Sequence, residues 1–299
     1  MSLSIVIEFI INVLSMGSLY ALIALGLVIV YGICKLINFA YGEYITAAAY
    51  LLVFCAGLSL PWWVAFVLAI LGGALIGFLS ELIAYRPFRG RSLDALLVTS
   101  FGISIILQRV FQVFISPRPK AVNLPAFMSA TISLFGITTP LRNIIVIITT
   151  AVLLLVLLYI MQKTPLGIAM RAAAENFTTA RLMGVNANLV ISTAFIISGF
   201  LAGFVCLFWV ARTGSVEPTL GASPLLIGFI AVVVGGMNSL PGAVVGGYLY
   251  ALVANVLSLA LPTSLLSYRD AIMFVIVICF LVLKPEGLIR GNYQEERVG

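Results

Sequence analysis

The stretch IVIEFIINVLSMGSLYALIALGLVIVY, residues Ile5–Tyr31, decides the character of the chain, because its only charged side chain is Glu8. About 20 apolar residues are enough to cross the hydrocarbon core of a membrane as a helix. A secretion signal begins with a basic region and has an apolar core of about 7–15 residues. This stretch lacks the first feature and far exceeds the second, so we expect it to stay in the protein as a membrane span.

The whole chain has a similar composition, since 63% of its 299 residues are hydrophobic and only 9% are charged. A soluble domain carries charge on about a quarter of its residues, so this chain has too few ionic groups to cover a surface that faces water. At roughly 20 residues for each crossing, the length allows about 8–10 spans. We therefore predict an all-α protein, a polytopic transmembrane helical bundle that forms a single domain over residues 1–299.

Nine apolar stretches are candidates for these spans, and the seventh and the ninth are short. They are Ile5–Tyr31, Ile37–Leu58, Trp62–Ala84, Leu93–Ile115, Asn143–Met161, Leu189–Ala211, Pro224–Gly236, Gly242–Leu261 and Ala271–Leu283.

The positions of Lys and Arg indicate the orientation, because cytoplasmic connections retain positive charge. With the N-terminus outside and nine crossings, ten of these cations lie in inner connections and five in outer ones. This distribution predicts a cytoplasmic C-terminus, provided that the short seventh segment crosses or pairs with a re-entrant neighbour. The net charge of +6 is then explained by the cytoplasmic loops, and no nucleic-acid partner is expected.

Several kinds of chemistry are excluded by missing residues. The chain has no His, which removes histidine acid–base catalysis and imidazole metal ligation. It also lacks a GxxxxGK[ST] nucleotide loop, so any ATP must bind to another chain. The four cysteines lie in or beside apolar stretches without the spacing of a metal or redox pair: Cys34, Cys55, Cys206 and Cys279. We therefore expect no catalytic residue, metal or cofactor in this chain.

The most polar connection, QKTPLGIAMRAAAENFTTARLMGVNAN at residues 162–188, has the signals of an ordered helix. Thr164 and Pro165 are typical of an N-cap and a first helical position, and Gly184 is typical of a helix stop. These signals predict a cytoplasmic helix of about four turns over residues 164–184. Such a helix either rests on lipid headgroups as a connection or docks into a soluble partner. The residues expected on a docking surface are Arg171, Glu175, Asn176, Arg181 and Gly184.

A second cluster of interest is the glycine-rich stretch GGMNSLPGAVVGG at residues 235–247. Small residues allow transmembrane backbones to approach closely, so tight helix packing is expected there. Asn238, Ser239 and Pro241 among the glycines also fit a broken or re-entrant helix, and both interpretations stay open. The glycines predicted at close contacts are Gly235, Gly236, Gly242, Gly246 and Gly247.

Polar residues within the spans are candidates for a translocation path, because each needs a partner or water. Ser100, Ser104 and Gln108 recur every four residues and so share one helix face. Hydrogen bonds between helices explain this row as well as a path does. Glu81 is expected at a membrane interface, near the end of its span. The candidate path residues are Asn38, Glu43, Thr99, Ser100, Ser104 and Gln108.

The segment GIAMRAAAENFTTARLMGVN, Gly167–Asn186, resembles the cytoplasmic ATPase-coupling motif of ABC importer permeases, in particular those of the branched-chain amino acid (Liv-type) family. Four further blocks resemble the same family in the same order, so that the resemblance spans nearly the whole chain. These blocks are Gly17–Glu43, Arg86–Gln108, Val232–Leu252 and Tyr268–Gly291.

The resemblance implies a permease subunit of an ATP-driven importer in the plasma (inner) membrane of a bacterium or archaeon, which moves branched-chain amino acids delivered by a periplasmic binding protein. It also implies a second homologous permease, two ABC ATPase subunits that hold ATP and Mg, contact with membrane lipid, and a path along the permease interface. The chain reads LLIGF at Leu225–Phe229 where the family often has LKAF, so urea, short amides and aromatic acids are alternative solutes. A self-sufficient channel or secondary transporter is a second class, but it has no use for a docking helix and usually places clearer carboxylate sites at mid-membrane.

Overall fold

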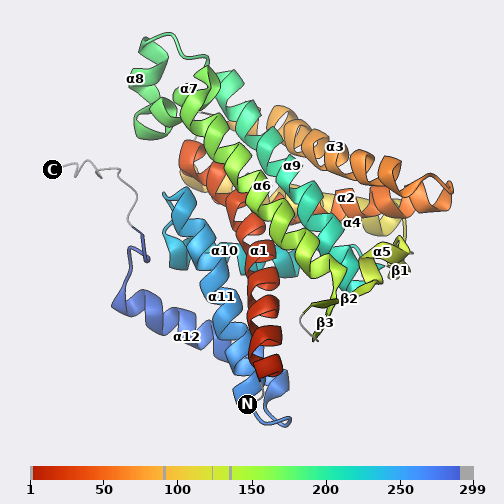
Figure 1. Ribbon diagram of the computed structural model, residues 1–299. Helices are drawn as coiled ribbons and strands as arrows, with labels where there is room; N and C mark the ends of the chain where they lie inside the picture. Colours follow the sequence, from red (N-terminus) through yellow and green to blue (C-terminus); the bar gives the residue numbers. More distant parts are fainter. Residues whose placement is uncertain (1–2, 90–91, 123, 135–136, 290–299) are drawn as a thin grey trace.

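The computed structural model describes residues 3–89, 92–122, 124–134 and 137–289. Three arginines of the charge distribution lie outside these ranges, namely Arg91, Arg290 and Arg297. Figure 1 shows a bundle of helices around α1 (Leu3–Cys34), which packs against helices from both halves of the chain.

Each of the nine predicted apolar stretches contains a helix, which confirms the expected all-α membrane bundle. They are α1, α2 (Tyr41–Gly57), α3 (Trp62–Ser80), α4 (Leu93–Phe114), α6 (Leu141–Lys163), α9 (Ala187–Thr213), α10 (Ala222–Gly235), α11 (Leu240–Ala260) and α12 (Arg269–Leu283). Among the described residues, seven helices are long and apolar enough to cross a membrane, counting the turns that extend α3 and α12.

The three shortest of these helices are α10, with 14 residues, α12, with 15, and α2, with 17. Short length was predicted for the seventh and the ninth stretch, which contain α10 and α12, and η3 (Leu266–Tyr268) extends α12 to a continuous span of 18 residues. The second stretch is shorter than predicted. The helix in this stretch, α2, begins only at Tyr41. The chain between the end of α1 at Cys34 and this residue is not helical, and Lys35 within it has a positive φ of 51°.

The first turns of α2 and α10 meet inside the bundle. The Gly221 amide donates a hydrogen bond of 3.0 Å to Thr46 Oγ1, and a Cβ on Gly42 would collide with the Gly221 carbonyl. The Tyr41 ring lies against Gly26, eight residues before the end of α1, which places it about 12 Å inside that end. Two short helices therefore begin within the bundle at one junction.

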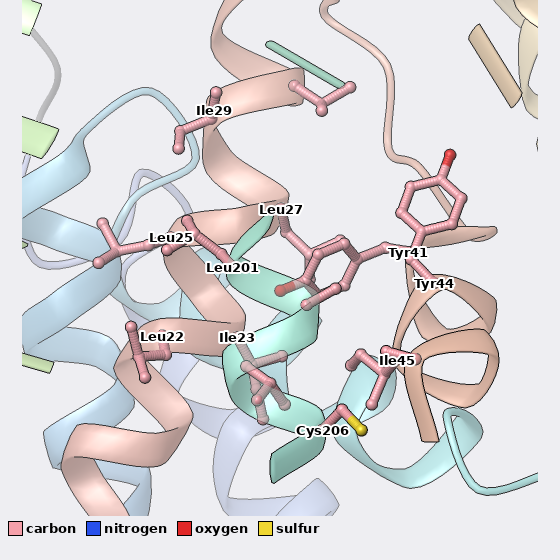
Figure 2. Close-up of a cluster of buried hydrophobic side chains, with 14 of the residues drawn as sticks. Leu22, Ile23, Leu25, Leu27, Ile29, Tyr41, Tyr44, Ile45, Leu201 and Cys206 are labelled. Atoms are coloured by element: carbon pink, nitrogen blue, oxygen red, sulfur yellow. The ribbon is translucent and has the colours of Figure 1, made fainter. Parts of the chain in front are cut away.

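The core is formed mainly by α1, α2 and α9. Figure 2 shows Ile23 and Leu27 of α1 facing Tyr41 and Ile45 of α2, with side chains of α9 such as Cys206 beside them. All five side chains are buried. This packing fixes the position of α2, and with it the polar residues that precede and begin α2.

The predicted helix over residues 164–184 is in fact two helices, α7 (Pro165–Glu175) and α8 (Phe177–Leu182). Asn176 separates them in an extended conformation, and its Oδ1 accepts a hydrogen bond from the Thr179 amide at 2.9 Å, which caps α8. The predicted signals at both ends are correct, since Thr164 Oγ1 accepts from the Gly167 amide at 3.1 Å and Gly184 has a φ of +87°. The single helix was wrong because Asn176 caps a new helix and interrupts the first.

The two ends of the bundle differ. At one end α7 and α8 project together beyond α6 and α9 (Figure 1), and we call this the α7–α8 end. It also contains the ends of α1 and α12 and the turns η1 (Glu81–Tyr85) and η2 (Arg86–Phe88) that follow α3. The opposite end has α5 (Ala126–Ser129) and two small antiparallel sheets. The strands are β1 (Lys120–Ala121) with β4 (Ser215–Val216), and β2 (Thr131–Leu134) with β3 (Ile137–Pro140).

Candidate functional site

The α7–α8 pair is fixed firmly to the bundle by one face. Gly167, Met170 and Ala173 are buried, and a Cβ on Gly167 would meet the backbone of Ile160 and Met161 at the end of α6. Glycine at residue 167 therefore allows α7 to fold back closely on α6, so the outer face of the pair has a defined position relative to the membrane helices.

The outer face of the pair combines charge with exposed apolar side chains. Leu182 and Met183 at the end of α8 are 83% and 81% exposed. Arg171 and Glu175 lie one turn apart but form no ion pair with any described residue. All residues predicted for the docking surface are exposed: Arg171, Glu175, Asn176, Arg181 and Gly184.

Three of the predicted path residues meet inside the bundle. Glu43 is 1% exposed, and its Oε1 accepts hydrogen bonds from Ser104 Oγ at 3.1 Å and from Gln108 Nε2 at 2.8 Å. Its other oxygen, Oε2, is buried and has no hydrogen-bond partner among the described residues. The arrangement joins the first turn of α2 to the middle of α4, and it leaves one carboxylate oxygen able to accept a donor.

The remaining path candidates have local roles. Asn38 Oδ1 accepts from the Tyr85 hydroxyl at 2.7 Å and from the Ala40 amide at 3.1 Å, which holds the non-helical segment before α2. Thr99 and Ser100 donate to carbonyls of their own helix, at 2.7 and 2.9 Å. Ser104 and Gln108 differ from these residues, because they donate hydrogen bonds to Glu43 of a neighbouring helix.

A buried ion pair was not predicted from the sequence. Glu81, which follows directly after α3, is fully buried within the protein, and it pairs with Arg89 and accepts a hydrogen bond from Ser192 Oγ at 2.6 Å. Arg89 also donates to Asn188 at the start of α9. The π-helical and 3-10 turns after α3 bring Arg89 back over Glu81, a geometry that the spacing of a regular helix does not indicate.

The predicted glycines lie at backbone contacts of three helices and the segment after α12. A Cβ on Gly235 or Gly242 would meet the carbonyl of the other, and one on Gly246 would meet the Ala231 carbonyl. Gly247 lies against Ala21 of α1 in the same way. Gly236 has a φ of +114° and ends α10, and Ile289 lies against it. Close packing and a helix break therefore occur together in this stretch.

No group of three or more Cys, Asp or Glu side chains suited to a metal ion occurs within the described ranges. The structure brings polar side chains together in three places. They are Glu43 with Ser104 and Gln108, which we call the Glu43 cluster, the buried pair of Glu81 with Arg89, and the exposed face of α7–α8.

The fold is similar to that of a chain in a solved ABC transporter. One chain of a solved structure described as a metal-chelate type ABC transporter in an inward-facing conformation aligns with a TM-score of 0.54 and 19% identity, over 92% of this chain and 87% of that one. The model of the family described as the permease component of the branched-chain amino acid transport system matches residues 9–281, and the chain belongs to this family.

Curated relatives agree with the family. The high-affinity branched-chain amino acid transport system permease protein BraD of Pseudomonas aeruginosa is 32% identical over 96% of both chains. The ribose import permease protein RbsC of Haemophilus influenzae is 29% identical over 93% of this chain and 84% of its own length. The family assignment therefore applies to nearly the whole chain.

Proposed function

We propose that this chain is the membrane-spanning permease subunit of an ATP-driven importer of branched-chain amino acids. The observation that carries the proposal is the family match over residues 9–281, which includes nearly all of the nine helices that correspond to the predicted apolar stretches. The similarity to BraD over 96% of both chains supports the same substrate class.

The proposed assembly has a second homologous permease, two ABC ATPase subunits with their ATP and Mg, and a periplasmic binding protein. ATP hydrolysis takes place on the ATPase chains, and this chain conducts the solute. The absence of a GxxxxGK[ST] loop from the sequence is consistent with this division.

In this assembly α7–α8 is the coupling element and lies in the cytoplasm. Its exposed face offers Arg171 and Glu175 for polar contacts and Leu182 and Met183 for an apolar groove on an ATPase. The cations near the α7–α8 end support the orientation, because cytoplasmic connections are enriched in Lys and Arg. They are Lys35, Arg86, Arg89, Lys163, Arg171, Arg181 and Lys284.

The Glu43 cluster is the proposed polar point of the solute path. An amino acid carries an ammonium group, and the unpartnered Glu43 Oε2 is an acceptor of the matching charge. Since α4 packs mainly on α2 and η1, movement of α4 relative to α2 would expose Glu43. The cluster then provides a transient contact, and the binding protein provides the selection.

Purification through a tag on this chain tests the proposed assembly. The expected result is recovery of an ABC ATPase and a second permease in comparable amounts, with ATP hydrolysis in the eluate. Recovery of this chain alone, as a monomer or a homo-oligomer that conducts solute, would contradict the proposal and favour a self-sufficient channel or carrier.

A further inference from the structure

A cavity of about 830 Å³ lies at the α7–α8 end of the bundle, and its walls come from five parts of the chain. They are the end of α1 with the segment after it, the turns η1 and η2 with the residue after them, the first turn of α4, α8, and the start of α9. The lining residues are Ile33, Cys34, Lys35, Leu36, Tyr85, Arg89, Leu93, Leu96, Phe177, Arg181, Asn186, Ala187, Asn188, Ile191 and Phe195.

The charged groups of this lining have one sign. Lys35, Arg89 and Arg181 are cations, and no carboxylate is among the described lining residues. Glu81 pairs with one terminal nitrogen of Arg89 from behind the wall. Lys35 Nζ donates to Asn238 at 2.8 Å, and burial lowers the pKa of this ammonium.

Two of the three cations retain unused donors. Arg89 Nε is buried and has no hydrogen-bond partner among the described residues. Arg181 forms neither a hydrogen bond nor an ion pair with any of them. A buried donor without a partner is costly, and a guanidinium matches the oxygens of a phosphate or carboxylate group. Only Arg89 Nε is such a buried donor, whereas Arg181 is exposed and adds a second positive charge to the same lining. Together the two side chains favour an anionic ligand.

Apart from Tyr85, Asn186 and Asn188, the remaining lining is apolar, and it continues into exposed apolar side chains of α4. Leu93 lines the cavity and is 54% exposed. Phe101 and Ile105, farther along α4, are also exposed, at 49% and 57%, and the Phe101 ring stacks on Phe39 with 4.0 Å between the ring centroids. An occupant with a long apolar part can place its head in the cavity and its chain against these exposed side chains of successive turns, which we call the Leu93 row.

We propose that the cavity binds the headgroup of an anionic phospholipid, with the phosphate between Arg89 and Arg181 and one acyl chain against the Leu93 row of α4. A free anion would satisfy the guanidinium groups but would leave the apolar walls without a partner. The bound lipid connects α8 to α4, which are otherwise held to different parts of the bundle. The site does not depend on the identity of the solute, and Arg181 belongs both to this site and to the surface expected to dock.

The test uses the full protein with the subunits that copurify with it, in nanodiscs of phosphatidylcholine with a minor fraction of phosphatidylglycerol. Native mass spectrometry counts the lipids that remain bound. For wild type we expect retention of phosphatidylglycerol above its share of the bilayer. Arg181→Gln should lower this retention about fivefold, the loss typical of one basic contact with anionic lipid.

Lys163→Gln is the matched control, because Lys163 is an exposed cation at the same end of the bundle that does not line the cavity. Leu96→Trp provides a second variant, which fills the cavity without removing charge and should also lower retention. Equal retention of the two lipids by wild type would overturn the proposal, as would equal losses in Arg181→Gln and Lys163→Gln. Displacement of the lipid by millimolar inorganic phosphate would overturn it in favour of a free-anion site.

Discussion

At the scale of single residues, Glu43 illustrates how a charged side chain is accommodated among membrane helices. Its Oε1 receives donors from Ser104 and Gln108 of α4, and its Oε2 receives none from the described residues. Two substitutions separate the structural from the transport role. Glu43→Gln keeps a carbonyl acceptor for Ser104 and Gln108, whereas Glu43→Leu removes both bonds.

We expect Glu43→Leu to lower the stability of the bundle by about 1 kcal/mol, because a hydrogen bond between membrane helices contributes on average about 0.6 kcal/mol. Glu43→Gln should assemble normally but transport the amino acid about tenfold more slowly, since one lost charged contact corresponds to about 1.4 kcal/mol or more. Complex recovery and solute uptake measure the two effects. Wild-type uptake by Glu43→Gln would show that the carboxylate has only a structural role.

Gly246 gives a second prediction at this scale. A side chain there meets the Ala231 carbonyl of α10, and overpacking costs about 1–3 kcal/mol even in soluble cores. Gly246→Leu should therefore lower the thermal stability of the solubilised protein and the recovery of its partners. Val245→Leu, at the neighbouring position that is 42% exposed, is the control and should behave like wild type. Equal melting temperatures for the two variants would contradict the close contact at Gly246.

At the scale of elements, the membrane helices could be predicted from the length of the apolar stretches. A single segment that crosses lipid must satisfy its backbone hydrogen bonds internally, and only a helix does so. The breaks were less predictable. The sequence shows a cap at Thr164 and a stop at Gly184, but the interruption at Asn176 depends on which of two local hydrogen-bonding patterns this residue adopts. The ion pair of Glu81 with Arg89 depends on irregular turns, and the contact of Glu43 with Gln108 joins residues far apart in the chain.

The α7–α8 pair carries the prediction for coupling. Glu175→Arg reverses an exposed charge on its outer face and should reduce substrate-stimulated ATP hydrolysis on the order of tenfold, because like charges across an interface cost several kcal/mol. Membrane insertion should be unaffected, since the side chain is not part of the core. Glu8→Arg reverses an exposed charge at the start of α1 and is the control. Normal stimulation in an assembled Glu175→Arg complex would show that this face does not dock.

At the scale of the whole molecule, the short helices α2 and α10 meet at Gly42 and Gly221 inside the bundle. Irregular backbone at membrane depth is stable only where protein or a water-filled cavity surrounds it. The junction is next to the Glu43 cluster and connects both halves of the chain, so relative movement of α2, α4 and α10 is the simplest way to open a path. The exposed α7–α8 pair at one end is the part of this chain best placed to transmit such movement.

The most direct test of the central claim is solute uptake into proteoliposomes that contain this chain, its copurifying partners and the binding protein, with ATP on the ATPase side. The account predicts accumulation of leucine against its gradient that requires both ATP and the binding protein, with no comparable uptake of ribose, urea or an aromatic acid. Leucine that merely equilibrates without ATP, or accumulation of ribose in place of leucine, would contradict it.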